Sequence, residues 1–121
     1  MNEHKPEGWP AIAPRLFTPD VPGLTNFIKT VFGATGEVRD DQPTELWIDG
    51  SVILVSDGAG MRDPLPGYLY VYVPDIDAAF REAVAAGAEV IEGPVNMPYG
   101  DRRATVKDRW GNMWQMATRQ L

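Results

Sequence analysis

Residues 107–120, KDRWGNMWQMATRQ, decide how this chain folds. The Asp, Gly and Asn near the start of this stretch indicate a tight turn, and the residues after them indicate a strand. Within that strand Trp114 and Met116 are large and apolar, but the amide Gln115 stands between them. Because successive side chains of a strand point to opposite faces, we expect Trp114 and Met116 in the core and Gln115 on the other face.

An internal repeat organises the rest of the chain. Residues 17–34, FTPDVPGLTNFIKTVFGA, and residues 72–88, YVPDIDAAFREAVAAGA, each run from a strand end through Pro-Asp into an amphipathic helix and a Gly-Ala pair. Asp20 and Asp75 are predicted to cap the N-termini of the helices. Gly33 and Gly87 of the two Gly-Ala pairs are predicted to cap the C-termini. The apolar residues expected to face the core are Leu24, Phe27, Ile28, Val31 and Phe32 in the first helix, and Ile76, Ala79, Phe80, Ala83 and Val84 in the second.

Each predicted helix is followed by three short stretches with the composition of strands, bounded by Gly, Asp and Pro. The stretches are TGEVRDD (35–41), TELWIDG (44–50) and SVILVSDG (51–58) in the first half, and EVIEGPV (89–95), RATVKDR (103–109) and GNMWQMAT (111–118) in the second. We therefore predict an α+β protein with two tandem βαβββ modules, about residues 11–57 and 66–119, joined by a linker at 58–65. They are expected to form a single domain over residues 1–121, with a curved mixed sheet around a cleft and the helices on the outside.

Composition limits the classes of function. The 121-residue chain is 44% hydrophobic and 23% charged, as is usual for a globular domain. Its net charge of −6 argues against a nucleic-acid partner, because phosphate binding needs a basic surface. It has no cysteine, which excludes disulfides and thiolate chemistry. With no long apolar run and no signal-peptide pattern at its start, the chain is expected to be cytoplasmic, without a membrane partner.

Tandem βαβββ modules of this length resemble the vicinal oxygen chelate superfamily, which includes glyoxalase I, bleomycin-resistance proteins and extradiol dioxygenases. The segments that carry the resemblance, which is nearest to the PhnB-like branch, are FGATGE (32–37), ELWIDGSVILVSD (45–57) and YGDRRATVKDRWGNMWQMAT (99–118). The last segment is similar to the family's Gly-Asp-Arg, Asp-x-x-Gly and Trp signature, here Gly100, Asp101, Arg102, Asp108, Gly111 and Trp114. The resemblance implies a homodimer, in which paired modules of two chains complete the clefts.

The resemblance also implies where a metal would bind. In metal-using members, four His, Glu or Gln side chains from the first and last strand of each module converge in the cleft. The corresponding positions here are about Ala13, Leu54, Tyr68 and Gln115, and a shift of one residue brings in Pro14, Val55 or Leu69. The one histidine, His4, lies in a polar lead at the start of the chain. One donor out of four cannot hold a divalent metal, so we predict no metal and no other cofactor.

Strand alternation instead predicts an aromatic, partly polar cleft for a small organic ligand. Tyr68, Tyr70 and Tyr72 share one face of their strand, and the apolar residues between them belong against the helix. The predicted ligand-binding residues are Arg15, Phe17, Trp47, Leu54, Tyr68, Tyr70, Tyr72, Arg103 and Gln115. No catalytic residue is assigned. The alternative for the tyrosines is an amphipathic strand surface or a dimer contact.

Four polar residues have alternative interpretations. Arg15 is expected either to bind an anionic group or to pair with a surface carboxylate. Asp101 and Arg102 are expected to form a local pair that stabilises a turn rather than a catalytic pair. Gln115 is expected either to bond an organic ligand or to bond a tyrosine hydroxyl across the cleft.

The favoured hypothesis is a metal-free, glyoxalase/bleomycin-resistance-like protein that binds a small organic molecule, cationic or planar because the chain is acidic and the cleft aromatic. The alternative is a metal-independent lyase or isomerase of the same superfamily, with an unidentified small substrate. Its candidate catalytic groups are Glu45, a cleft tyrosine and Arg15. A third hypothesis is an interaction module whose cleft is filled by its own side chains.

Overall fold

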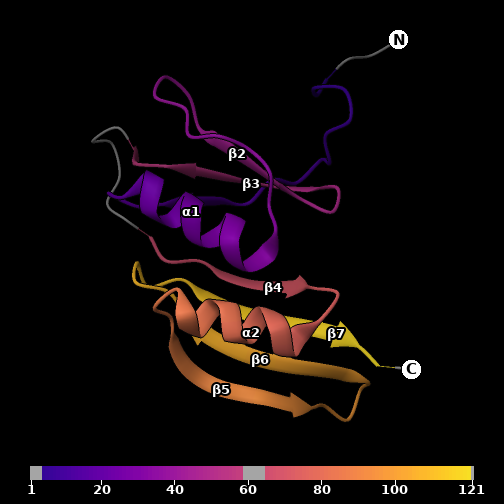
Figure 1. The fold of residues 1–121 in the computed structure, drawn as a ribbon. Helices are drawn as coiled ribbons and strands as arrows, with labels where there is room; N and C mark the ends of the chain where they lie inside the picture. Colours follow the sequence, from indigo (N-terminus) through magenta and orange to yellow (C-terminus); the bar gives the residue numbers. More distant parts are fainter. Residues whose placement is uncertain (1–3, 59–64, 121) are drawn as a thin grey trace. The chain divides into compact units, whose positions relative to one another are not determined.

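The computed structural model describes residues 4–58 and 65–120 (Figure 1). They divide into two compact units, of which unit 1 covers residues 1–29 and 33–65 and unit 2 covers residues 30–32 and 66–121. Most of the predicted linker, 58–65, lies outside the described residues. The elements are β1 (Arg15–Phe17), α1 (Val21–Phe32), β2 (Thr44–Ile48), β3 (Ser51–Ser56), β4 (Tyr68–Tyr72), α2 (Ile76–Ala85), β5 (Glu89–Asn96), β6 (Asp101–Lys107) and β7 (Met113–Arg119).

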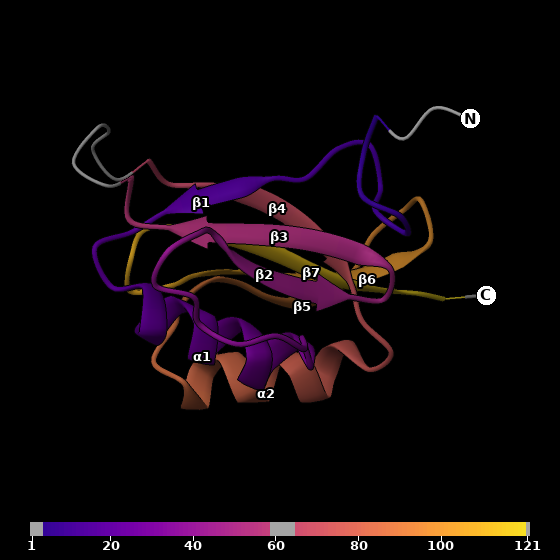
Figure 2. The same cartoon turned by 90° about the horizontal axis from the view of Figure 1, so that it is seen from above.

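Unit 1 holds a mixed sheet of strand order β1-β3-β2. Strand β1 runs parallel to β3, as expected for strands joined through a helix, and β2 is antiparallel to β3. Helix α1 runs along this sheet (Figure 2), and Leu24, Phe27, Ile28 and Val31 are buried as predicted. The alternating side chains Leu16, Leu46 and Val55 complete the core of this unit.

One predicted strand of the first half does not form. Among residues 35–41 the only ladder contact described is an isolated bridge between Thr35 and Trp47. Gly36 adopts a φ of 138°, outside the range of a strand, and a Cβ at this position would clash with the carbonyl oxygen of Glu45. The chain therefore leaves the sheet directly after Thr35, and the first module is βαββ rather than βαβββ.

The predicted helix caps are confirmed. The Asp20 carboxyl accepts a hydrogen bond from the Gly23 N–H at 3.0 Å, and Asp75 accepts one from the Ala78 N–H at 3.2 Å. Gly33 has a φ of 69°, and its N–H donates to the Lys29 carbonyl at 3.0 Å. Gly87 follows α2 with a φ of 95°. Both glycines supply the left-handed residue that ends a helix.

The apolar stripe of α2 is narrower than predicted. Ile76, Ala79 and Ala83 are buried, but Val84 is 42% exposed. Val84 lies eight residues after Ile76, which turns it about 80° away around the helix axis. Phe32 holds the same place relative to Leu24 in α1, and it is only half-buried. The residue at i+8 therefore marks the edge of the apolar face in both helices.

Unit 2 holds a mixed sheet of order β4-β7-β6-β5, with β4 parallel to β7 and the other pairs antiparallel. Helix α2 packs against β5, β6 and β7. Trp114, Met116, Ala104 and Val106 point to the face covered by α2 and are fully buried. Gln115 points to the opposite face. The alternation predicted for this strand is thus confirmed.

The turn between β6 and β7 is built around Asp108, which is 4% exposed. Its carboxyl accepts hydrogen bonds from the backbone N–H groups of Trp110 and Asn112, each at 2.9 Å, and from the Trp114 indole at 2.7 Å. Asn112 donates its amide to the same carboxyl and accepts from the Gly67 N–H at 2.7 Å. The turn is therefore joined to the start of β4.

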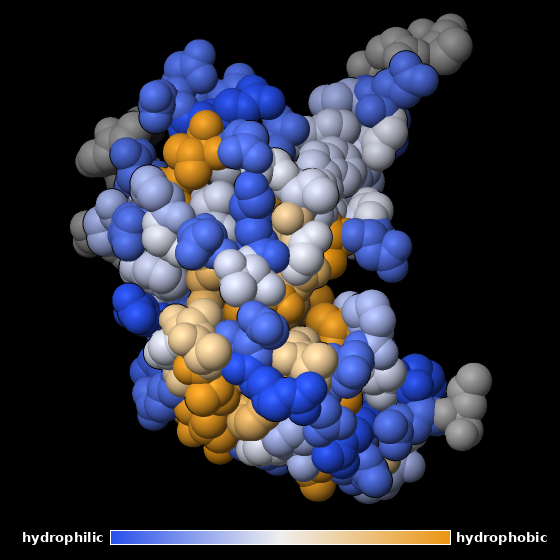
Figure 3. Space-filling view, viewed as in Figure 1, coloured by the Kyte–Doolittle hydropathy of each residue, from blue (hydrophilic) through white to orange (hydrophobic). Residues whose placement is uncertain are grey.

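Strand β5 forms an edge of this sheet and carries exposed apolar residues. Figure 3 shows orange side chains gathered over this strand, where Val90 and Ile91 are exposed. The ladder between β5 and β6 shifts register between Val90 and Glu92 and again between Glu92 and Val95. Such irregularities hinder the pairing of an edge with another chain.

Two helices and seven strands in two mixed sheets thus make up the described part of the chain, and the predicted α+β class is confirmed. Neither of the two helices is long and apolar enough to span a membrane.

Candidate functional site

The face of the unit 2 sheet opposite α2 carries Tyr68, Tyr70 and Tyr72, which are 64%, 39% and 58% exposed. In the ladders, Tyr70 stands opposite Gln115, and Arg103 stands opposite Ala117. Since residues paired across a ladder point to the same side, all five predicted site residues of this unit share the face. We call the surface formed by Tyr68, Tyr70, Tyr72, Arg103 and Gln115 the tyrosine face.

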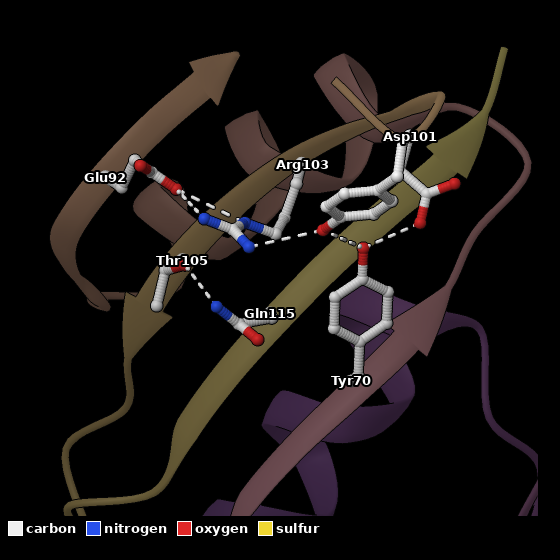
Figure 4. Close-up of polar contacts among 7 residues, drawn as sticks. Tyr70, Glu92, Asp101, Arg103, Thr105 and Gln115 are labelled. Atoms are coloured by element: carbon white, nitrogen blue, oxygen red, sulfur yellow. Dashed lines mark hydrogen bonds and ion pairs between the residues drawn. The ribbon is translucent and has the colours of Figure 1, made fainter. Parts of the chain in front are cut away.

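A carboxylate that is 1% exposed, Asp101 at the start of β6, organises the tyrosine face (Figure 4). One of its oxygens accepts hydrogen bonds from the hydroxyls of Tyr70, at 2.7 Å, and Tyr72, at 2.9 Å. The other oxygen accepts from the Arg119 guanidinium at 3.2 Å. The two phenol rings lie edge to face, with centroids 5.4 Å apart.

The expected pair between Asp101 and Arg102 does not form. Arg102 instead forms a salt bridge with Asp77 of α2, at 3.1 Å, on the other side of the sheet. Neighbours in a strand point to opposite faces, so the alternation that placed Gln115 also places Asp101 and Arg102 on opposite sides. That signal was in the sequence and would have put Asp101 beside Arg103.

Arg103 extends the polar network toward β5. Its guanidinium forms a salt bridge with Glu92 at 3.0 Å and donates to the Tyr99 hydroxyl at 3.3 Å (Figure 4). The Tyr99 hydroxyl lies 3.2 Å from that of Tyr70. Tyr99 belongs to the turn before β6, where no periodic pattern pointed to it. The network therefore runs without a break from Glu92 to Asp101.

These contacts set the charge states of the face. Burial and the hydrogen bonds with Tyr99 and Asp101 raise the pKa of Tyr70, and the hydrogen bond to Asp101 raises that of Tyr72. The hydrogen bond from Tyr70 lowers the pKa of Asp101; desolvation opposes this, and Tyr72 and Arg119 reinforce it. At neutral pH the face therefore holds protonated phenols around an ionised carboxylate.

Gln115 bonds within the sheet. Its amide nitrogen lies 3.4 Å from the Thr105 hydroxyl, its ladder partner on β6 (Figure 4). The expected tyrosine partner is thus replaced by Thr105. A bond of this length is weak, so the amide is free to turn toward a ligand at small cost.

The four predicted site residues of unit 1 also share one face of their sheet. Arg15 and Leu54 are ladder partners, and Phe17 and Trp47 alternate with core residues on their strands. The Arg15 guanidinium lies 5.8 Å from the centre of the Phe17 ring. The Trp47 ring packs edge-on against Trp9 at 5.4 Å, a contact that the sequence did not reveal.

A pocket of about 790 Å³ opens in unit 1. Arg15 and Phe17 line it, together with the start of α1, residues 38–43 and the end of β3, whereas Trp47 and Leu54 do not. The Ser56 hydroxyl in its wall is buried and has no partner among the described residues. Its volume lies in the range of small-molecule sites, roughly 300–1,000 Å³.

The residues at the family's metal positions do not fit a metal. Ala13 and Leu54 have no donor atom, and Tyr68 is a phenol on the exposed face. Gln115 offers one neutral amide. In residues 4–58 and 65–120 there is also no cluster of three or more His, Cys, Asp or Glu side chains suited to a metal ion. The donor set therefore lacks the imidazole and carboxylate ligands that divalent metals need.

The fold and the residues of these faces define a known class of protein. The model of the Glyoxalase/Bleomycin resistance protein/Dioxygenase superfamily matches residues 11–116, and the chain belongs to this superfamily. The structure is similar to that of TioX from Micromonospora sp. ML1, with a TM-score of 0.75 and 22% identity, over 89% of this chain and 97% of that one. It is also similar to a glyoxalase/bleomycin resistance protein/dioxygenase family enzyme from Burkholderia phytofirmans PsJN, with a TM-score of 0.74 and 21% identity, over 88% and 95% of the two chains.

Sequence relatives occur in mycobacteria. A Mycobacterium bovis protein is 27% identical over 88% of this chain and 82% of its own length. A Mycobacterium tuberculosis protein is equally similar over 88% of this chain and 73% of its own length. The likeness to the two solved structures concerns the fold alone, because identity is low.

Proposed function

We propose that this protein binds a small, planar organic molecule on the tyrosine face, without a metal ion. The observation that carries the proposal is the buried Asp101 carboxylate beneath exposed phenols. A carboxylate taken out of water is costly unless it is fully hydrogen-bonded, and here Tyr70, Tyr72 and Arg119 supply the bonds. The arrangement holds aromatic rings in place at the surface, which lowers the entropy that a ligand must remove on binding.

The unit 1 pocket supports the same function. It combines a cation, Arg15, with an aromatic ring, Phe17, and an unpartnered hydroxyl, Ser56. An apolar wall with a few polar groups that fix orientation is usual for small-molecule sites. Arg15 has no carboxylate partner among residues 4–58 and 65–120, which favours its role as a ligand group over that of a surface ion pair.

Binding is tested with a panel of planar aromatic compounds, read by thermal shift and calorimetry. We expect at least one compound to raise the melting temperature of the wild-type protein. The double variant Tyr68→Ser/Tyr72→Ser should lose this shift, because it removes two of the three rings. The control variant is Val84→Ser on α2, which packs against the other face of the sheet, and it should keep the thermal shift. A panel without any shift in the wild-type protein would contradict the proposal.

The metal-free state is tested by elemental analysis. We expect the purified protein to contain no stoichiometric Mn, Fe, Ni or Zn, and chelator treatment to leave its melting temperature unchanged. The reason is the donor set, with Ala13 and Leu54 at two of the four family positions. Near-unit occupancy by any of these metals would contradict this part of the proposal.

The alternative function is a metal-independent lyase or isomerase. Such a reaction needs a general base, and Tyr70 is a poor one because its raised pKa keeps it protonated at neutral pH. Glu45 and Arg15 are the remaining candidates. In the unit 1 sheet both are ladder partners of Leu54 on β3, Arg15 from β1 and Glu45 from β2. Turnover of a bound compound that Glu45→Gln abolishes in a folded protein would favour this alternative.

Three narrower assignments complete the proposal: membership of the PhnB-like branch, a homodimer and a cytoplasmic location. The first is supported by the three segments that carry the resemblance, 32–37, 45–57 and 99–118, and the second by the same resemblance, which implies that paired modules of two chains complete the clefts. Light scattering at several protein concentrations measures the second directly, and a monomer at all of them would contradict it.

A further inference from the structure

The polar groups of the tyrosine face form one continuous chain. The Arg103 guanidinium is 3.3 Å from the Tyr99 hydroxyl, which is 3.2 Å from the Tyr70 hydroxyl, which is 2.7 Å from the Asp101 carboxylate (Figure 4). One end is a cation that only donates hydrogen bonds, and the other is an anion that only accepts them. The two ends therefore determine the direction of every bond between them.

Each phenol has one proton to give. Tyr70 and Tyr72 must both donate to Asp101, since an ionised carboxylate has no proton. Tyr70 then has none left for Tyr99, so Tyr99 donates to Tyr70 and accepts from Arg103. This direction of donation is the one that satisfies Arg103, Tyr99, Tyr70 and Asp101 together. Successive bonds in such a chain strengthen one another.

The consequence for a ligand is that the Tyr70, Tyr72 and Tyr99 oxygens can only accept, because their protons are already given to other groups. The Tyr72 oxygen is the most available acceptor, because its proton points to Asp101 and no hydrogen bond to that oxygen comes from the described residues. The Tyr70 oxygen, by contrast, already accepts from Tyr99. A ligand group next to Tyr72 must therefore bring its own donor.

Charge by itself does not repel a cation here. Asp101 is paired with Arg119, and Glu92 with Arg103, so the network is neutral as a whole. The faces of aromatic rings attract cations with or without N–H groups. The presence of donors on the ligand, rather than its charge, is thus the property that the Tyr72 oxygen can distinguish.

We infer that the tyrosine face selects protonated amines carried on a planar apolar group, with the amine N–H donating to the Tyr72 oxygen. This inference rests on the proposed function and names the ligand class for the same face. A carboxylate in the same place would set its lone pairs against those of Tyr72. It would leave both groups without a partner.

Three probes with the same ring separate donor from charge: 2-naphthylmethylammonium, its N,N,N-trimethyl analogue and 2-naphthoate. In calorimetry on the full chain at pH 7 we expect the primary ammonium to bind about fivefold tighter than the trimethyl analogue, the worth of one hydrogen bond. Naphthoate should bind most weakly. Equal affinities, or tightest binding of either other probe, would overturn the inference and leave the proposed function standing. If none of the three binds, the proposed function fails as well.

The variant Tyr72→Phe keeps the ring and removes the acceptor. We expect the ratio of affinities for the primary and trimethyl probes to fall from about five to about one. The ratio is the readout, because the variant also loses the bond to Asp101 that holds the ring, which weakens both probes alike. Val84→Ser on α2 is the control, because it lies away from the tyrosine face, and it should keep the ratio. A ratio unchanged by Tyr72→Phe overturns the inference, and thermal unfolding checks that both variants fold.

Discussion

Replacing Asp108 by alanine should destabilise the protein by about 4 kcal/mol. The substitution leaves four buried or partly buried donors without their acceptor: the N–H groups of Trp110 and Asn112, the Asn112 amide and the Trp114 indole. Each unsatisfied buried donor costs about 1–3 kcal/mol, and neighbouring losses overlap. Denaturant unfolding followed by tryptophan fluorescence measures the change. A loss of this size is a large part of the roughly 5–15 kcal/mol that stabilises a typical domain.

Two further variants define what Asp108 contributes. Asp108→Asn keeps the size of the side chain but turns an NH₂ group toward donors, so it should remain at least about 2 kcal/mol less stable than the wild-type protein. Asp41→Ala removes an exposed carboxyl in the segment before β2 and should change stability by less than about 0.5 kcal/mol. If Asp108→Ala costs no more than Asp41→Ala, the turn network is not what holds the β6–β7 hairpin.

Asp101→Asn should weaken binding of a planar ligand to the tyrosine face by about tenfold, because the Tyr70 and Tyr72 rings are no longer held in place. One amide oxygen cannot serve both the two phenols and Arg119, so at least one side of the network loses its acceptor. Asp77→Asn is the matched control. It breaks an ion pair with Arg102 on the other face of the same sheet and should leave the affinity unchanged.

The pH dependence of binding follows from the same carboxylate. Hydrogen bonds from Tyr70, Tyr72 and Arg119 lower the pKa of Asp101 in the folded protein. A lowered pKa means that the stabilising contribution is present above the usual carboxyl range and is lost as the pH falls through the folded value. Affinity and the near-ultraviolet circular dichroism of the tyrosines should therefore stay constant from pH 7 down to about 4 and decline only below it. A decline already complete at pH 5 would contradict this assignment.

The contacts of the tyrosine face oppose the use of Tyr70 or Tyr72 as a general base. The phenols of Tyr70 and Tyr72 are held in their protonated form by a carboxylate, which suits recognition and opposes proton abstraction. The superfamily includes both enzymes and binding proteins, so the fold does not decide between them. In this chain the distinction lies in a few side chains, above all Asp101 and the aliphatic residues at the family's metal positions.

Much of the tyrosine face could be predicted from the sequence, because successive side chains of a strand alternate between its two faces. That alternation placed Tyr68, Tyr70, Tyr72 and Gln115 on one face and Trp114 on the other, and the structure agrees. The same rule would have separated Asp101 from Arg102, but proximity in the chain suggested a pair instead. The strand predicted at 35–41 does not form. The composition of this stretch is typical of a strand, but the φ of Gly36 takes the chain out of the sheet.

By itself the sequence determined the α+β class, the two helices with their caps and the alternation of faces along β4 and β7, because these depend on neighbours within a few positions. Only the tertiary structure decided that Asp101 binds Tyr70 and Tyr72 from β4, that Arg103 meets Glu92 and Tyr99, and that Asp108 receives the Trp114 indole. Most of these bonds join residues 11 to 31 positions apart, so their partners are set by strand order and register, which local patterns do not contain.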